Sequence, residues 1–155
     1  MSIATEEISG FLELGMWEEA NEVVEALPPE EKTLPEILSL RVRIYFAAGS
    51  WELMAEVSHH LTKIDPSQSA HWLNYSQATI YVDGLPLALE ILKQAEKRFP
   101  DDAGVLYTLA LRESTMGLIE EAKAHLNAAI RLDPRYRQNA LDDPELNALW
   151  DDFTS

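Results

Sequence analysis

The chain has 155 residues, 46% hydrophobic and 25% charged, which is typical of a globular domain and not of a disordered segment. It has no cysteine, which excludes disulfides, zinc ribbons and thiol catalysis, and its net charge of −15 argues against nucleic acid and anionic lipid as partners. No apolar run approaches the roughly 20 residues that cross a bilayer, and the first residues lack signal-peptide features, so we expect a cytoplasmic location and no membrane insertion.

Apolar residues recur at helical spacing along the chain, and the pattern divides residues 1–136 into four units of equal length. These units cover 1–34, 35–68, 69–102 and 103–136. Each predicts a pair of helices, because apolar residues lie at helical spacing on both sides of a turn. First helices are predicted over about 2–14, 35–48, 69–82 and 103–116, and second helices over about 17–27, 51–64, 85–98 and 119–132.

Prolines and glycines set this register. Pro66, Pro100 and Pro134 are 34 residues apart, and each follows a predicted second helix, because proline cannot continue the helical hydrogen-bond ladder. A glycine that permits positive φ is expected between the two helices of a unit. The corresponding positions in the four units hold Gly15, Gly49, Asp83 (beside Gly84) and Gly117.

These positions resemble those of the tetratricopeptide-repeat (TPR) family, over 136 of the 155 residues. The fourth unit matches best, with Gly117, Ala122 and Pro134 in place. The first matches least, because it ends early at Pro28-Pro29 and has Lys32 where proline is expected. The resemblance implies an all-α protein, a right-handed α-solenoid of four helical hairpins.

Residues 137–155 predict a C-terminal capping helix. Asp143 suits the N-cap and Pro144 the first helical position. A solenoid needs a segment that covers its last apolar face, and one apolar stripe of the tail fits this role: Leu146, Leu149, Trp150 and Phe153. Trp150 is ambiguous, because it can cap the array or protrude toward a partner chain.

No arrangement typical of an enzyme occurs in the sequence: there is no Gly-rich phosphate loop, nucleophile elbow or HExxH motif. Adjacent histidines such as His59 and His60 point about 100° apart on a helix and cannot share a metal. His71 and His125 lie in different units, without a carboxylate or histidine at ligand spacing. We therefore expect no catalytic residue, no metal and no cofactor.

The resemblance implies that the first helices line a concave groove, which holds a peptide or a helix of a partner protein. Aromatic residues would supply contact area and amides would pair with backbone groups. The predicted groove residues are Arg43, Phe46, Asn74, Gln77, Tyr81, Tyr107 and Leu111. An ordinary solvated helix face is the alternative for these positions.

The function implied is that of a protein-interaction scaffold or adaptor, with a protein or peptide as partner. The alternative is a self-assembling structural module, a homo-oligomer in which Trp150 and the tail dock onto another copy. Negative charge is concentrated at both ends of the chain, with nine acidic residues against one basic residue in 1–34. Such ends keep an elongated array in solution or form an acidic docking site.

Overall fold

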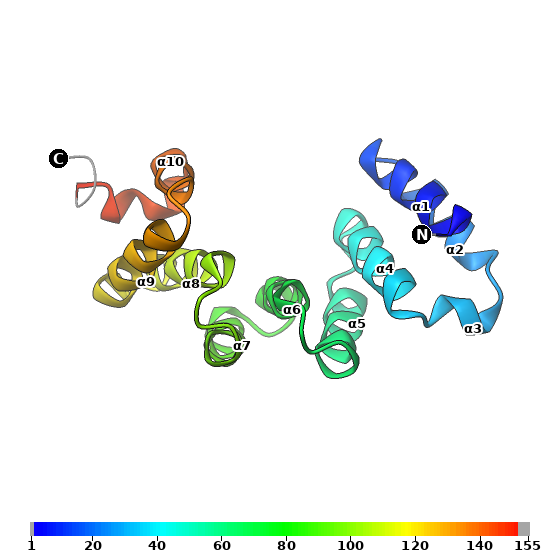
Figure 1. The fold of residues 1–155 in the computed structure, drawn as a ribbon, viewed down its shortest axis with the longest axis horizontal. Coiled ribbons are helices and arrows are strands. Elements are labelled where there is room, and N and C mark those ends of the chain that lie inside the picture. The colour runs from blue at the N-terminus through cyan, green and yellow to red at the C-terminus, as the bar shows by residue number, and fades with distance from the viewer. Residues whose placement is uncertain (1, 152–155) are drawn as a thin grey trace. The chain divides into compact units, whose positions relative to one another are not determined.

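The computed structural model describes residues 2–151, and every regular element in that range is a helix (Figure 1). The predicted all-helical fold is confirmed, and eight helices agree with their predicted bounds to within two residues. They are α1 (Ile3–Glu13), α2 (Trp17–Glu25), α4 (Pro35–Ala48), α5 (Trp51–Ile64), α6 (Ser69–Val82), α7 (Leu85–Arg98), α8 (Ala103–Thr115) and α9 (Ile119–Leu132). Within residues 2–151, none of the helices has the length and apolar character needed to span a membrane.

Three short helices complete the described chain: α3 (Pro29–Lys32), α10 (Tyr136–Asp142) and the 3₁₀-helix η1 (Pro144–Leu149). The prediction of a single helix in the tail is wrong, because Asp143 leaves the helical conformation between α10 and η1. Its carboxylate instead accepts a hydrogen bond from the backbone N–H of Glu145 at 3.0 Å, which caps η1 as predicted. Pro144 has no N–H with which to continue α10.

The turns within the hairpins depend on glycine. Gly49 ends α4 with a φ of 70°, a left-handed conformation that is unfavourable for residues with a side chain. In the third hairpin the positive φ of 100° falls on Gly84 and not on Asp83. The helices α5, α7 and α9 end at Ile64, Arg98 and Leu132, each two residues before a proline. The sequence signals that set the register therefore also end the helices.

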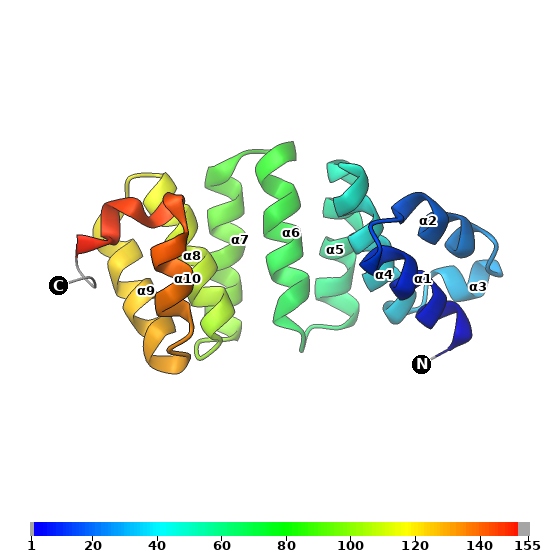
Figure 2. The same ribbon diagram turned by 90° about the horizontal axis from the view of Figure 1, so that it is seen from above.

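The chain divides into two compact units, one up to Val82 and one from Asp83 onward, so that the division falls between α6 and α7. The first unit contains α1–α6 and has two core clusters. One joins α1, α2 and α4 through Ile8, Val24 and Ile44, and the other joins α4, α5 and α6 through residues such as Met54 and Ala78. Figure 2 shows α5 and α6 running antiparallel, as a helical hairpin requires.

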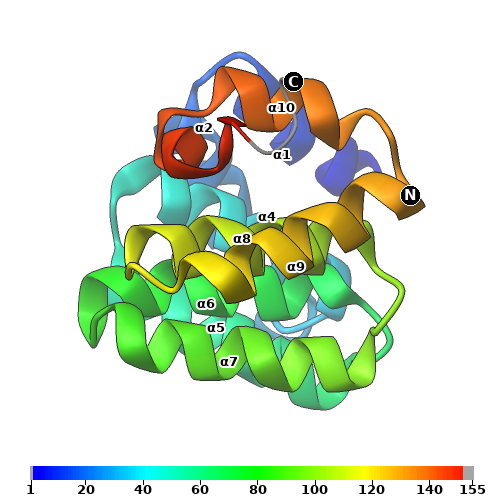
Figure 3. The same cartoon turned by 90° about the vertical axis from the view of Figure 1, so that its left-hand side faces the viewer.

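The second unit contains α7–α10 and η1. Here α8 and α9 pack side by side, and the tail crosses their apolar face (Figure 3). Leu146 and Leu149 are fully buried against Ala110, Ala122 and Leu126. The Trp150 ring packs on the same cluster, and its indole N–H donates to the carbonyl of Ala140 at 2.8 Å. The capping role predicted for the tail is thus confirmed for Leu146, Leu149 and Trp150, while Phe153 lies outside the described residues.

Candidate partner-binding site

Three aromatic side chains gather where α4 ends, α5 begins and α6 ends, and we call them the aromatic site: Phe46, Trp51 and Tyr81. The rings of Trp51 and Tyr81 stack with their centroids 4.1 Å apart and their planes within 10°. Phe46 meets Trp51 edge-on, at 5.7 Å and 77°. Phe46 and Tyr81 are 52% and 57% exposed, so about half of each of these two side chains is in contact with solvent.

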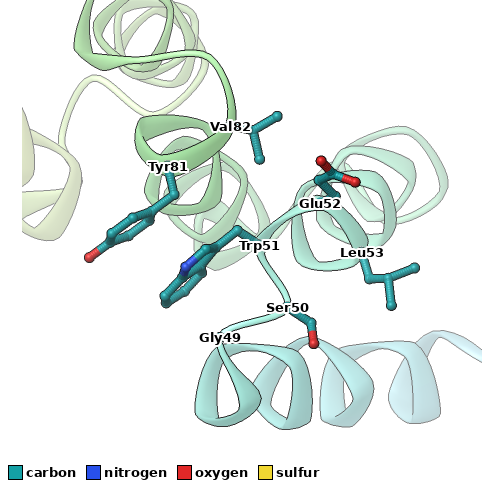
Figure 4. Close-up of a pocket in the computed structure, with 7 residues that line it drawn as sticks. All are labelled: Gly49, Ser50, Trp51, Glu52, Leu53, Tyr81 and Val82. Atoms are coloured by element: carbon teal, nitrogen blue, oxygen red, sulfur yellow. The ribbon is translucent and has the colours of Figure 1, made fainter.

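The aromatic site adjoins a pocket of about 430 Å³ (Figure 4). Trp51 and Tyr81 form one wall, with their rings beside each other, and Leu53 and Val82 add apolar surface. Glu52 supplies a carboxylate. The pocket therefore combines an aromatic wall with one negative charge, an arrangement suited to an apolar side chain that has a positive group nearby.

Local sequence explains why these rings meet. Phe46 lies in the last turn of α4, and Gly49 then turns the chain so that Trp51 becomes the first residue of α5. Tyr81 lies in the last turn of α6, which runs antiparallel to α5. The end of α6 is therefore next to the start of α5, and the two rings can stack.

The other predicted groove residues of the first unit lie on the same two helices. Arg43 is exposed on α4, almost one turn before Phe46. Asn74 and Gln77 are half-buried on α6, within two turns before Tyr81. Of the five predicted residues in this unit, Phe46 and Tyr81 are brought together through their shared contact with Trp51.

Tyr107 and Leu111 of the second unit lie beneath the C-terminal segment. The Tyr107 ring is 4.7 Å from that of Tyr136, and both Tyr107 and Leu111 pack against the cluster that the tail covers. Burial raises the pKa of Tyr107 to about 12, and the carboxylates of Asp143, Glu145 and Asp142 act in the same direction. The tail therefore occupies the surface around these two residues.

Trp51 is not among the predicted groove residues, although it begins the predicted second helix 51–64. In the structure Trp51 packs against the core cluster of α4–α6 and also contacts both Phe46 and Tyr81, at the centre of the aromatic site. Its place as the first residue of a second helix was the available signal. A side chain at a helix end borders the turn, where neighbouring helices leave surface uncovered.

A second feature that the sequence did not reveal is a charged trio in the second unit: Glu96, Glu113 and His125. The two ring nitrogens of His125 lie 2.5 Å from a Glu113 oxygen and 2.7 Å from a Glu96 oxygen. Carboxylates accept hydrogen bonds, so only the doubly protonated imidazolium can donate to both. The hydrogen bond to Glu113 is the largest cause that raises the pKa of His125, to about 8, against an opposing contribution from burial.

The sequence has no carboxylate at ligand spacing around His71 or His125, yet the structure places carboxylates beside both, because these come from other helices and from a helix end. His71 also contacts Asp65, at 3.0 Å. Neither arrangement is a metal site: in residues 2–151 no group of three His, Asp or Glu could hold a metal ion. In the charged trio, both histidine nitrogens are used for ion pairing.

The charged trio predicts that stability depends on pH. The pKa of His125 is higher in the folded protein than the ordinary value of 6.5, so its stabilising contribution is complete below about pH 6.5 and is lost as the pH rises through about 8. We expect a loss of up to about 2 kcal/mol between pH 6.5 and 9. Denaturant titrations across this range measure it. The His125→Gln variant should lose this pH dependence, and an unchanged dependence would assign it to other groups.

No protein-family model matches the chain, and no curated protein matches it. Solved structures do match. A thermophilic TPR protein of Thermus thermophilus aligns with 97% of this chain and 81% of its own, at a TM-score of 0.75 and 21% identity. The alignment with MamA covers 97% of this chain and 84% of the MamA chain, at a TM-score of 0.74 and 16% identity. A structure of MamA from Desulfovibrio magneticus, from residue 41 to its end, aligns with 98% of this chain. The alignment covers 88% of that structure's chain, at a TM-score of 0.71 and 21% identity. The chain therefore has the TPR fold, and the predicted fold class, an α-solenoid of helical hairpins, is confirmed.

Proposed function

We propose that the chain is a protein-interaction scaffold or adaptor, and that the aromatic site anchors a protein or peptide partner. The observation that carries this proposal is the exposure of Phe46 and Tyr81 on either side of Trp51, next to a pocket. Large aromatic side chains in solvent cost free energy that a partner recovers by covering them. Aromatic residues of this kind dominate the energetics of protein interfaces.

The proposed binding surface extends from the aromatic site along α4 and α6. Arg43, Asn74 and Gln77 are the predicted residues there, and they would pair with polar groups of a peptide backbone or of acidic side chains. Tyr107 and Leu111 remain predicted members of the groove on α8. They contact the tail, so they would contribute to binding only together with it or after its displacement.

The alternative proposal is a self-assembling module that docks through Trp150. The indole N–H of Trp150 already donates to Ala140 and its ring packs on its own chain, so the scaffold is the better-supported function. Sedimentation velocity over a wide concentration range tests the alternative. A dimer that Trp150→Ala abolishes would favour self-assembly through the tail.

Replacing both exposed rings tests the proposed site. Peptides selected for binding to the intact chain from a displayed library are titrated against the wild type and a Phe46→Ala/Tyr81→Ala variant. We expect affinity to fall by about 2–4 kcal/mol, or roughly 30-fold or more, because each ring is an anchor with low entropic cost of ordering. Isothermal titration calorimetry measures the change.

The matched control is Leu14→Ala/Leu132→Ala, which removes two exposed apolar side chains outside the aromatic site, 75% and 47% exposed. This variant should bind the same peptides with unchanged affinity. Equal losses in both variants, or a loss in the control alone, would show that the peptides bind elsewhere and would reject the aromatic site.

A further inference from the structure

A second apolar groove lies between α1 and α2, in the first unit and separate from the aromatic site. It encloses about 520 Å³. Its apolar lining includes Phe11 from α1, Val23 from α2 and Leu27, which lies two residues after the end of α2, all half-buried. Ile3 lies at its end and is 84% exposed. The small side chains of Ala4 and Ala26 leave room for a backbone to approach.

The groove belongs to the hairpin itself, because its lining residues come from α1, α2 and the two residues that follow α2. Another face of the same two helices packs on α4, where Ile8, Ala20 and Val24 are fully buried. The lining residues recur three or four positions apart on each helix, as Ala4, Glu7 and Phe11 do on α1. Two such stripes on antiparallel helices form a groove in which the apolar face of a third, amphipathic helix can pack.

The borders of the groove are acidic. Glu7 on α1 and Glu19 and Glu22 on α2 line it. They belong to a run of 31 residues that contains no Lys, Arg or His, and Lys32, the first basic residue, pairs with Glu25 at 3.5 Å. The carboxylates of this groove are therefore available to neutralise positive charge that a ligand brings.

We infer that this acidic groove binds a basic amphipathic α-helix of a partner protein. The ligand would place apolar residues at positions i, i+3 or i+4 and i+7 over Phe11, Val23 and Leu27, and lysine or arginine along its flanks, beside the glutamates. A second copy of this chain is a poor occupant, because copies that each carry a net charge of −15 repel one another.

The test uses the intact chain and three synthetic 18-residue peptides. One is a basic amphipathic helix of leucine and lysine, one replaces each lysine by glutamate, and one has the basic composition in an order without helical amphipathicity. Only the first should bind tightly. Its amide shift perturbations in NMR should fall on α1 and α2, and they should persist in the Phe46→Ala/Tyr81→Ala variant, which separates this site from the aromatic site.

Paired variants distinguish the groove from general attraction to an acidic protein. Glu19→Gln/Glu22→Gln should weaken binding of the basic amphipathic peptide about fivefold at low salt. Glu120→Gln/Glu121→Gln, which removes the same charge at exposed positions of α9, should change it less than about twofold. Ile3→Ser, at an exposed position that the fold does not need, should also weaken binding.

Three results would overturn the inference. Equal effects of the two glutamine pairs would show that no specific groove is involved. If the basic peptide without helical amphipathicity binds as tightly as the amphipathic one, binding does not depend on a helix packed on the apolar residues of the groove. Concentration-dependent self-association of the chain that Ile3→Ser abolishes would assign the groove to a second copy.

Discussion

Truncation after Ala140 is expected to destabilise the second unit by about 5 kcal/mol or more, which is a large part of the stability of an ordinary domain. The truncation removes the fully buried side chains of Leu146 and Leu149 and the packed ring of Trp150. It also removes the Glu145 carbonyl that accepts a hydrogen bond from Ser114 at 2.9 Å. Chemical denaturation monitored by circular dichroism and tryptophan fluorescence measures the loss.

The matched control ends the chain after Asp151, which keeps every tail residue of the cap that the structure describes. It should be far more stable than the chain that ends at Ala140. Hydrogen exchange should show that the shorter truncation affects α8 and α9 strongly and α1 and α2 little, because the clusters around α1 and α2 share no residue with the tail. If the chain that ends at Ala140 unfolds like the full chain, the tail stabilises nothing and is available to a partner.

Replacing His125 with leucine is expected to cost about 3 kcal/mol or more at pH 6. The substitution leaves the Glu113 carboxylate, whose side chain is only 2% exposed, without its charged partner. An uncompensated buried charge is far more costly than the ion pair is stabilising. Urea denaturation at pH 6 measures the cost, since His125 is protonated there.

A double-mutant cycle separates the ion pair from simple packing. Glu113→Leu/His125→Leu removes both charges and should recover most of the stability lost by His125→Leu alone, since apolar groups can replace a buried pair at little net cost. His60→Leu serves as the control, because His60 is exposed. If the double variant is as unstable as the sum of the single ones, the two side chains do not act as a pair.

Local signals in the sequence were sufficient to predict where the helices of each hairpin begin and end. Glycine and proline each act on the backbone of their own turn, so Gly49 and Pro66 end helices in any environment that keeps the helices packed. The break at Asp143 was missed because its side chain was interpreted only as the start of a helix. The carboxylate does cap η1, but the same residue ends α10, which the apolar pattern alone does not indicate.

The site was harder to predict because its residues meet across helices. Glu96, Glu113 and His125 lie on α7, α8 and α9, so no short motif joins them. Glu113 follows Leu106 and Leu109 at helical spacing on the buried face of α8, and a charged residue at that position was the one available indication of a buried charge. Phe46 and Tyr81 were predicted from their faces alone, whereas the contact of each with Trp51 depends on the packing of α5 against α4 and α6.

The packing of helices on their neighbours in the sequence also has a kinetic consequence. The main contacts join α1 to α2, α4 to α5, α5 to α6 and α8 to α9, so most of the loops that the chain closes as it folds are short. Proteins with such local contacts fold within microseconds to milliseconds, because little chain entropy is lost before each contact forms. A hairpin that opens by fluctuation can therefore close again quickly, which shortens the time for which its apolar surface is available for aggregation.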